Sequence, residues 1–128
     1  MNKGNNEKTI MIVEDDEEFQ DLFAMMLEET GYKIIRAYDG TEALKKLEEE
    51  KEKPDLIILD ILLEAMMGDA FFLHLKRSPE YEDIPIIITS SFSAKDYKDL
   101  HTLDPKLVFL EKPFSKETLL KEVKAKLG

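Results

Sequence analysis

The chain contains no cysteine, so neither disulfide bonds nor thiol chemistry can stabilise it or carry its function. It also has no apolar run approaching the roughly 18 residues needed to span a bilayer. Residues 1–8 are polar and contain no apolar signal-peptide segment. These absences predict a soluble, cytoplasmic protein that does not associate with membranes.

Glycine and positive charge are also scarce. The five glycines are not clustered, which argues against a glycine-rich phosphate loop and therefore against nucleotide binding. Only 18 Lys and Arg residues stand against 28 Asp and Glu residues, which leaves a formal net charge of -10. Because clustered cations bind the phosphates of nucleic acids, we predict no direct binding of DNA or RNA.

Short apolar, β-branched runs alternate with longer amphipathic ones, a pattern typical of βα units and a parallel sheet. A chain of 128 residues can bury one core, so we predict a single domain over 1–128, with its core at 8–127 and a polar tail at 1–7. The expected strands are 9–13, 32–37, 56–63, 84–88 and 107–110. The expected helices are 16–30, 41–51, a segment from Gly68 to Ser78, 93–103 and 115–127.

Chemically active side chains stand at the ends of four of the apolar runs. Asp60 interrupts the most apolar stretch of the chain, where an ionised group needs a partner, a metal or a shifted pKa. The others are Glu14 and Asp15 after the first run, Thr89 and Ser90 after the fourth, and Lys112 after the fifth. Because the carboxyl ends of parallel strands share one edge of the sheet, we expect a single site there.

With these residues in place, the chain resembles the receiver domain of response regulators, the phosphoproteins of two-component and phosphorelay signal transduction. The matching marks are Val13-Glu14-Asp15-Asp16, Pro54-Asp55 leading to Asp60, Gly68, Pro85 leading to Ser90, and Lys112-Pro113-Phe114. The resemblance covers residues 8–127. It implies a doubly wound, flavodoxin-like (βα)5 fold with a parallel sheet in strand order 2-1-3-4-5.

Phosphoryl chemistry assigns a role to each residue of the expected site. A carboxylate can attack a phosphoryl group, but clustered carboxylates repel each other by roughly 4 kcal/mol per close pair at an effective dielectric of about 20. The site therefore needs cations. We predict Asp60 as the phosphoryl acceptor and Mg²⁺ on Asp15 and Asp60, with Glu14 bound directly or through water. Lys112 then supplies a second positive charge, and Ser90 a hydroxyl donor, to phosphoryl oxygens.

The resemblance adds three expectations that the residues alone do not give. The backbone carbonyl of Leu62 is a further metal ligand, and the Lys112–Pro113 peptide bond is cis. Phe109 is the aromatic residue that moves with Ser90 when the protein switches. Two alternatives stay open, because Thr89 is a rival for the role of Ser90 and Phe109 can equally be an ordinary core residue.

The function that the resemblance implies is a phosphorylation-controlled switch. A histidine kinase or histidine phosphotransfer protein donates the phosphoryl group to Asp60, and the modified domain acts on a downstream output protein or domain, with homodimerisation on phosphorylation as a further option. Such a protein catalyses only its own phosphotransfer and dephosphorylation and is not an enzyme on a free substrate. The alternative is a receiver-like interaction module with vestigial phosphorylation. A haloacid-dehalogenase-type phosphatase needs a second acid two residues after the nucleophile, where this chain has Leu62.

Overall fold

A five-stranded parallel sheet forms the centre of the computed structural model, which describes residues 8–49, 53–61, 68–90, 102 and 104–127. The strands lie in the order β2-β1-β3-β4-β5, as the resemblance to receiver domains implies. Their bounds are β1 Thr9–Val13, β2 Lys33–Ala37, β3 Leu56–Asp60, β4 Ile86–Ser90 and β5 Val108–Glu111. Every neighbouring pair is parallel, so all five carboxyl ends meet at one edge.

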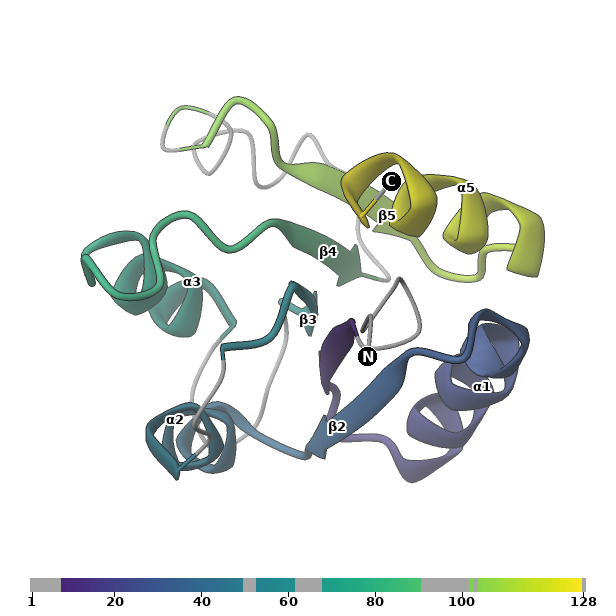
Figure 1. Ribbon diagram of the computed structural model, residues 1–128, viewed down its shortest axis with the longest axis horizontal. Coiled ribbons are helices and arrows are strands. Elements are labelled where there is room, and N and C mark those ends of the chain that lie inside the picture. The colour runs from purple at the N-terminus through teal and green to yellow at the C-terminus, as the bar shows by residue number, and fades with distance from the viewer. Residues whose placement is uncertain (1–7, 50–52, 62–67, 91–101, 103, 128) are drawn as a thin grey trace, which may run out of the picture.

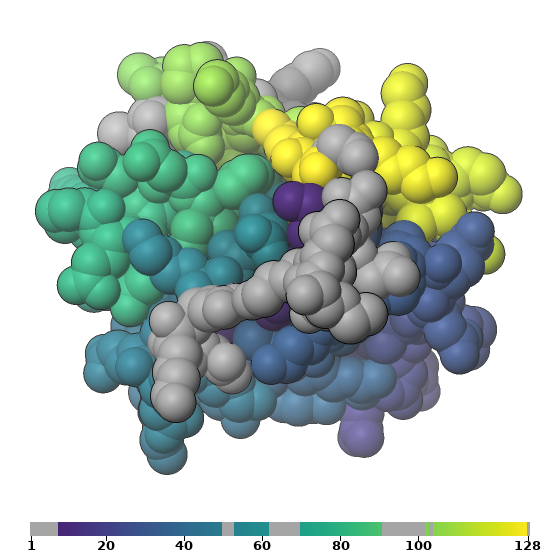
Figure 2. Space-filling model, in the orientation of Figure 1, coloured from purple at the N-terminus to yellow at the C-terminus, as the bar shows by residue number. Residues whose placement is uncertain are grey.

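Helices cover both faces of this sheet (Figure 1). They are α1 Glu17–Leu27, α2 Gly40–Glu49, α3 Gly68–Lys76 and α5 Lys116–Leu127, and a 3-10 turn, η2 Glu28–Thr30, follows α1. α1 and α5 lie side by side on one face, and α2 and α3 lie on the other (Figures 1 and 2). Of the helix expected at 93–103, only residue 102 is among the described residues. Within the described part of the chain, no helix is long and apolar enough to cross a membrane.

The core has two layers because successive side chains of a strand point to opposite faces. Met11, Val13 and Leu59 pack under α2 and α3, whereas Ile12 and Ile58 pack under α1 and α5. All five residues of β3 and of β4 are buried. A strand covered on both faces reads as a continuous apolar run, which is why these two strands could be recognised from the sequence.

Several element ends differ from the expected ones. β4 starts two residues later than expected because the Ile84 N–H donates to the Tyr81 carbonyl in a turn. It runs on through Thr89 and Ser90, so these residues are the last two of the strand and do not follow it. β3 ends at Asp60, three residues before the strand end that the apolar run predicts.

The first helix is also shorter than predicted. Asp16 is its N-cap, with the side chain accepting the Glu18 N–H at 2.8 Å, and its last turn tightens into η2. Gly31 ends the segment with φ of 75°, a left-handed conformation that glycine adopts without steric cost. The Asp16 cap fixes the direction in which α1 leaves the end of β1. It thereby also fixes the position of residues 14–16, which connect β1 to α1.

Candidate functional site

Three carboxylates meet at the carboxyl edge of the sheet. Glu14 and Asp15 follow β1, and Asp60 ends β3, the strand paired with β1. Each of the three offers one oxygen, and these oxygens lie within 4.8 Å of one another. Glu14 is 1% exposed and Asp60 is 6% exposed, so these two carboxylates are largely out of reach of water, whereas Asp15 is more exposed.

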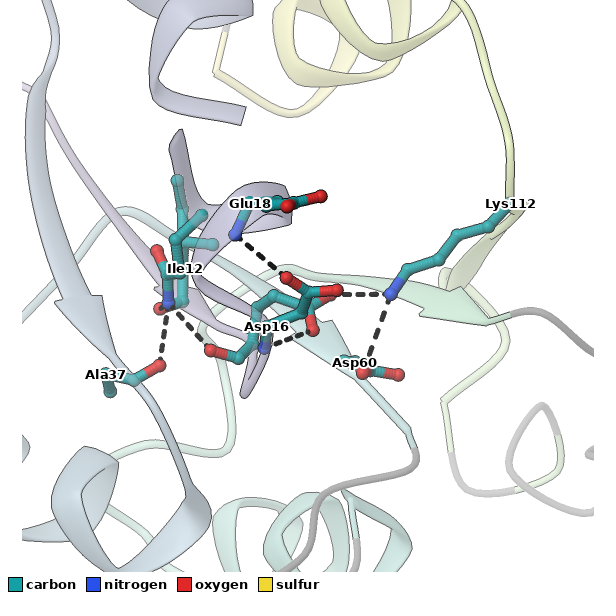
Figure 3. Close-up of polar contacts among 8 residues, drawn as sticks. Ile12, Asp16, Glu18, Ala37, Asp60 and Lys112 are labelled. Atoms are coloured by element: carbon teal, nitrogen blue, oxygen red, sulfur yellow. Dashed lines mark hydrogen bonds and ion pairs between the residues drawn. The ribbon is translucent and has the colours of Figure 1, made fainter. Parts of the chain in front are cut away.

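Lys112 brings a positive charge to the carboxylates from the end of β5 (Figure 3). Its Nζ lies 2.6 Å from Glu14 Oε1 and 3.5 Å from Asp60 Oδ2, and its side chain is 8% exposed. The Lys112 N–H donates to the Ser90 carbonyl at 2.6 Å, which ties this residue to the end of β4. The Lys112–Pro113 peptide bond is cis, as the resemblance implies.

Glu14 has an unusual protonation equilibrium. Burial raises its pKa to about 7, and the negative charge of Asp60 adds to this effect. The ammonium of Lys112 and the Asp16 N–H, which donates to Glu14 Oε2 at 3.0 Å, act in the opposite direction. One lysine therefore does not offset the cost of gathering these acids in a buried place.

Both candidate hydroxyls lie at the end of β4. Thr89 is directly opposite Asp60 in the β3–β4 register, and Ser90 is opposite Glu111 in the β4–β5 register. The two residues are 0% and 1% exposed. Among the described residues, Thr89 Oγ1 has no hydrogen-bond partner. Phe109 is partly buried and packs against the core layer under α2 and α3.

The family model of the response regulator receiver domain matches residues 10–124, nearly the whole of the described fold. The chain belongs to this family. The polar-differentiation response regulator DivK of Brucella anthropi is 34% identical over 121 residues, which cover 94% of this chain and 97% of that protein. In two-component systems, receiver domains interact with histidine kinases and with output domains.

Solved receiver structures have the same fold. The chemotaxis protein CheY4 of Vibrio cholerae superposes with a TM-score of 0.84 at 27% identity, covering 94% of this chain and 99% of that chain. The receiver domain of a sensor histidine kinase from Pseudomonas aeruginosa, solved with a magnesium ion in its active site cleft, has a TM-score of 0.81 at 23% identity. It covers 95% of this chain and 98% of that chain.

The acid cluster of this receiver domain has the donor set that a divalent cation needs. Its three ligand atoms are all carboxylate oxygens, which Mg²⁺ prefers over nitrogen and sulfur. Three acids against one lysine also leave an excess of negative charge that a divalent cation can neutralise. Leu62, the expected carbonyl ligand, lies outside the described residues.

A further residue of this receiver site, Gln20, was not found from the sequence. Its buried side-chain amide donates to the carbonyls of Ile12, Glu14 and Ala37 at 3.0, 3.1 and 2.8 Å. It thereby joins α1 to the ends of β1 and β2, and one of its contacts is with the main chain of Glu14 itself. The available signal is a polar residue within the buried stripe of α1 that Phe23 and Leu27 continue.

Proposed function

We propose that Asp60 accepts a phosphoryl group from a phosphohistidine of a histidine kinase or histidine phosphotransfer protein. A carboxylate oxygen of Asp60 attacks the phosphorus, the new O–P bond forms and the P–N bond to the imidazole breaks. The imidazole nitrogen keeps the electron pair and takes up a proton from solvent. The observation that carries this proposal is the position of the Lys112 ammonium between the buried carboxylates of Glu14 and Asp60.

The other residues lower the electrostatic barrier to this transfer. Asp15 and Asp60 would hold Mg²⁺, with Glu14 bound directly or through water and, as the family resemblance implies, the Leu62 carbonyl as a further ligand. The ion would supply positive charge against the repulsion between the phosphoryl group and the acids. Lys112 places its ammonium beside Asp60, where it can donate to a phosphoryl oxygen. The backbone N–H of Lys112 donates a hydrogen bond to the Ser90 carbonyl, so the main chain links Lys112 to the end of β4.

The consequence of phosphorylation is a change of conformation at the end of β4. We assign the switch to Ser90 and Phe109, with Thr89 as the rival hydroxyl. The new state controls an output protein or domain, and homodimerisation on phosphorylation is one form that this control can take. The domain catalyses only its own phosphotransfer and dephosphorylation, in the cytoplasm, and is not an enzyme on a free substrate.

The test is incorporation of acid-labile phosphate from acetyl phosphate, with and without Mg²⁺. We expect labelling of the wild type that requires Mg²⁺ and is abolished in Asp60→Asn. Asp55→Asn is the matched control, because Asp55 lies before β3 at the opposite end of that strand, where its side chain accepts the Thr9 N–H. Equal labelling of the wild type and Asp60→Asn would refute Asp60 as the acceptor. An unlabelled wild type would favour the interaction module with vestigial phosphorylation.

A further inference from the structure

We propose that Phe19, in the first turn of α1, is a positioning residue that holds the ammonium of Lys112 in the site. The Lys112 Nζ lies over the ring of Phe19, 4.1 Å from the ring centroid. Cation–π attraction extends to about 6 Å and is stronger where water is excluded. The Lys112 side chain is 8% exposed, so little water competes for its charge here.

An aromatic ring suits this position better than another acid. A further carboxylate would also hold the ammonium, but it would add to the negative charge that an incoming phosphoryl group meets. The face of Phe19 attracts the cation through its quadrupole and brings no net charge. Lys112 is thus kept beside Asp60, at 3.5 Å, without raising the electrostatic barrier to transfer.

A row of aromatic rings fixes the backbone next to Lys112 as well. Phe19 contacts Phe23 with ring centroids 5.9 Å apart, and Phe23 stacks on Phe114 at 5.5 Å with an interplanar angle of 9°. Phe114 lies two residues after Lys112. α1 therefore holds the Lys112 segment at two points, at the ammonium through Phe19 and at the main chain through Phe114.

The inference rests on the proposed function, and its test compares Phe19→Leu with Phe19→Tyr. Leucine keeps an apolar side chain but has no ring, whereas tyrosine keeps the ring face. We expect Phe19→Leu to slow Mg²⁺-dependent labelling by acetyl phosphate about 5-fold, with the rate retained in Phe19→Tyr. Met25→Leu, an exposed position on the same helix, is the control and should behave as the wild type.

Two further measurements separate positioning of Lys112 from a general structural effect. The affinity for Mg²⁺, from calorimetric titration, should be the same in Phe19→Leu and the wild type, because Phe19 is not a metal ligand. The ε-methylene protons of Lys112 should show an upfield ring-current shift in NMR spectra of the wild type and Phe19→Tyr, and this shift should vanish in Phe19→Leu. The Lys112→Arg variant identifies the resonance.

Equal labelling rates of Phe19→Leu and the wild type would overturn the inference and leave the proposed function intact. The inference also fails if Phe19→Tyr is as slow as Phe19→Leu, if the affinity for Mg²⁺ falls in parallel with the rate, or if the ring-current shift is missing from the wild type. A wild type that is not labelled at all would overturn the proposed function and, with it, this role of Phe19.

Discussion

At the scale of single residues, Glu14 shows what the site demands of its side chains. It is 1% exposed and contacts Lys112, yet burial keeps its pKa at about 7. A carboxyl group that is raised in pKa favours its neutral form in the folded protein. The folded state therefore has a cost at neutral pH that a bound divalent cation can remove.

This cost predicts how the stability of the metal-free protein depends on pH. Glu14 releases its proton near pH 4.5 in the unfolded state and near pH 7 in the folded state. Its contribution to stability is therefore fully present below pH 4.5 and is lost as the pH rises through 7. We expect Glu14→Gln to match the wild type at pH 4.5 and to be more stable by on the order of 3 kcal/mol at pH 8.

The measurement is urea denaturation from pH 4.5 to 8 in the presence of a chelator. The exposed Glu111 gives the matched control, and Glu111→Gln should keep the wild-type pH profile. A constant difference between the wild type and Glu14→Gln over this range would contradict the prediction.

The residues with chemistry could be predicted where the sequence marks them locally. Asp60 and Lys112 follow apolar runs, and a charge at the end of a buried strand has few structural explanations. Phe19 carries no such mark, because an apolar residue on the inner side of a helix is explained by packing alone. Gln20 carries only the weak mark of a polar residue within the buried stripe. Only their contacts across the fold reveal what they hold.

At the scale of elements, α1 holds together the ends of β1 and β2 at the site. Asp16 caps its start, Gln20 joins it to the carbonyls at the ends of β1 and β2, and Gly31 ends the segment that follows it. The helix and its apolar stripe could be read from the sequence, but its end could not, because periodicity does not distinguish the last α-helical turn from the 3-10 turn η2.

Replacing Gln20 by leucine should lower the free energy of unfolding by about 1–3 kcal/mol. Leucine has a similar volume, but the carbonyls of Ile12 and Glu14 lose the donor that the amide supplies. Chemical denaturation measures the change. Met25→Leu, on the exposed side of the same helix, should stay within about 0.5 kcal/mol of the wild type. If the two variants are equally stable, the amide does not have the role assigned to it.

Gly31 gives a second prediction at this scale. Gly31→Ala should destabilise the protein by roughly 1–2 kcal/mol, because φ of 75° places a Cβ close to the following carbonyl oxygen. Gly31→Asn should cost less, since asparagine visits the left-handed region more readily. Thermal melts of the two variants check this order, and a reversed order would show that backbone conformation is not what the position requires.

At the scale of the whole molecule, the alternation of apolar and amphipathic runs predicts a parallel sheet between two helical layers, and the fold has that architecture. The strand order 2-1-3-4-5 could not be read from periodicity, which reports only local structure. It came from the family resemblance, and with it the expectation that β1 and β3 are neighbours. That adjacency is what brings Glu14 and Asp60 together.

Divalent cations should stabilise the whole fold. A ligand that binds only the folded state at 100 times its Kd adds about 2.7 kcal/mol of stability, so Mg²⁺ should raise the thermal midpoint by several degrees. Asp15→Asn should reduce this rise in the thermal midpoint, because one of the three carboxylate ligands becomes a neutral amide.

Circular-dichroism melts with and without MgCl₂ test this prediction. Since the net charge of -10 makes general screening favourable, NaCl at equal ionic strength is the necessary control. A rise in midpoint that NaCl reproduces in full would contradict specific binding of Mg²⁺ at the acid cluster.

The ion pair between Lys112 and Glu14 joins residues 98 positions apart in the chain. Contacts of such sequence separation form late in folding, because the loop that they close is costly in entropy. In the finished sheet, β3 and β4 lie between β1 and β5, so Lys112 reaches Glu14 across two intervening strands. During synthesis, Lys112 also emerges after Glu14, Asp15 and Asp60. A nascent or partly folded chain therefore has its acids but lacks its ammonium, and the ability to receive a signal arises only with the completed fold.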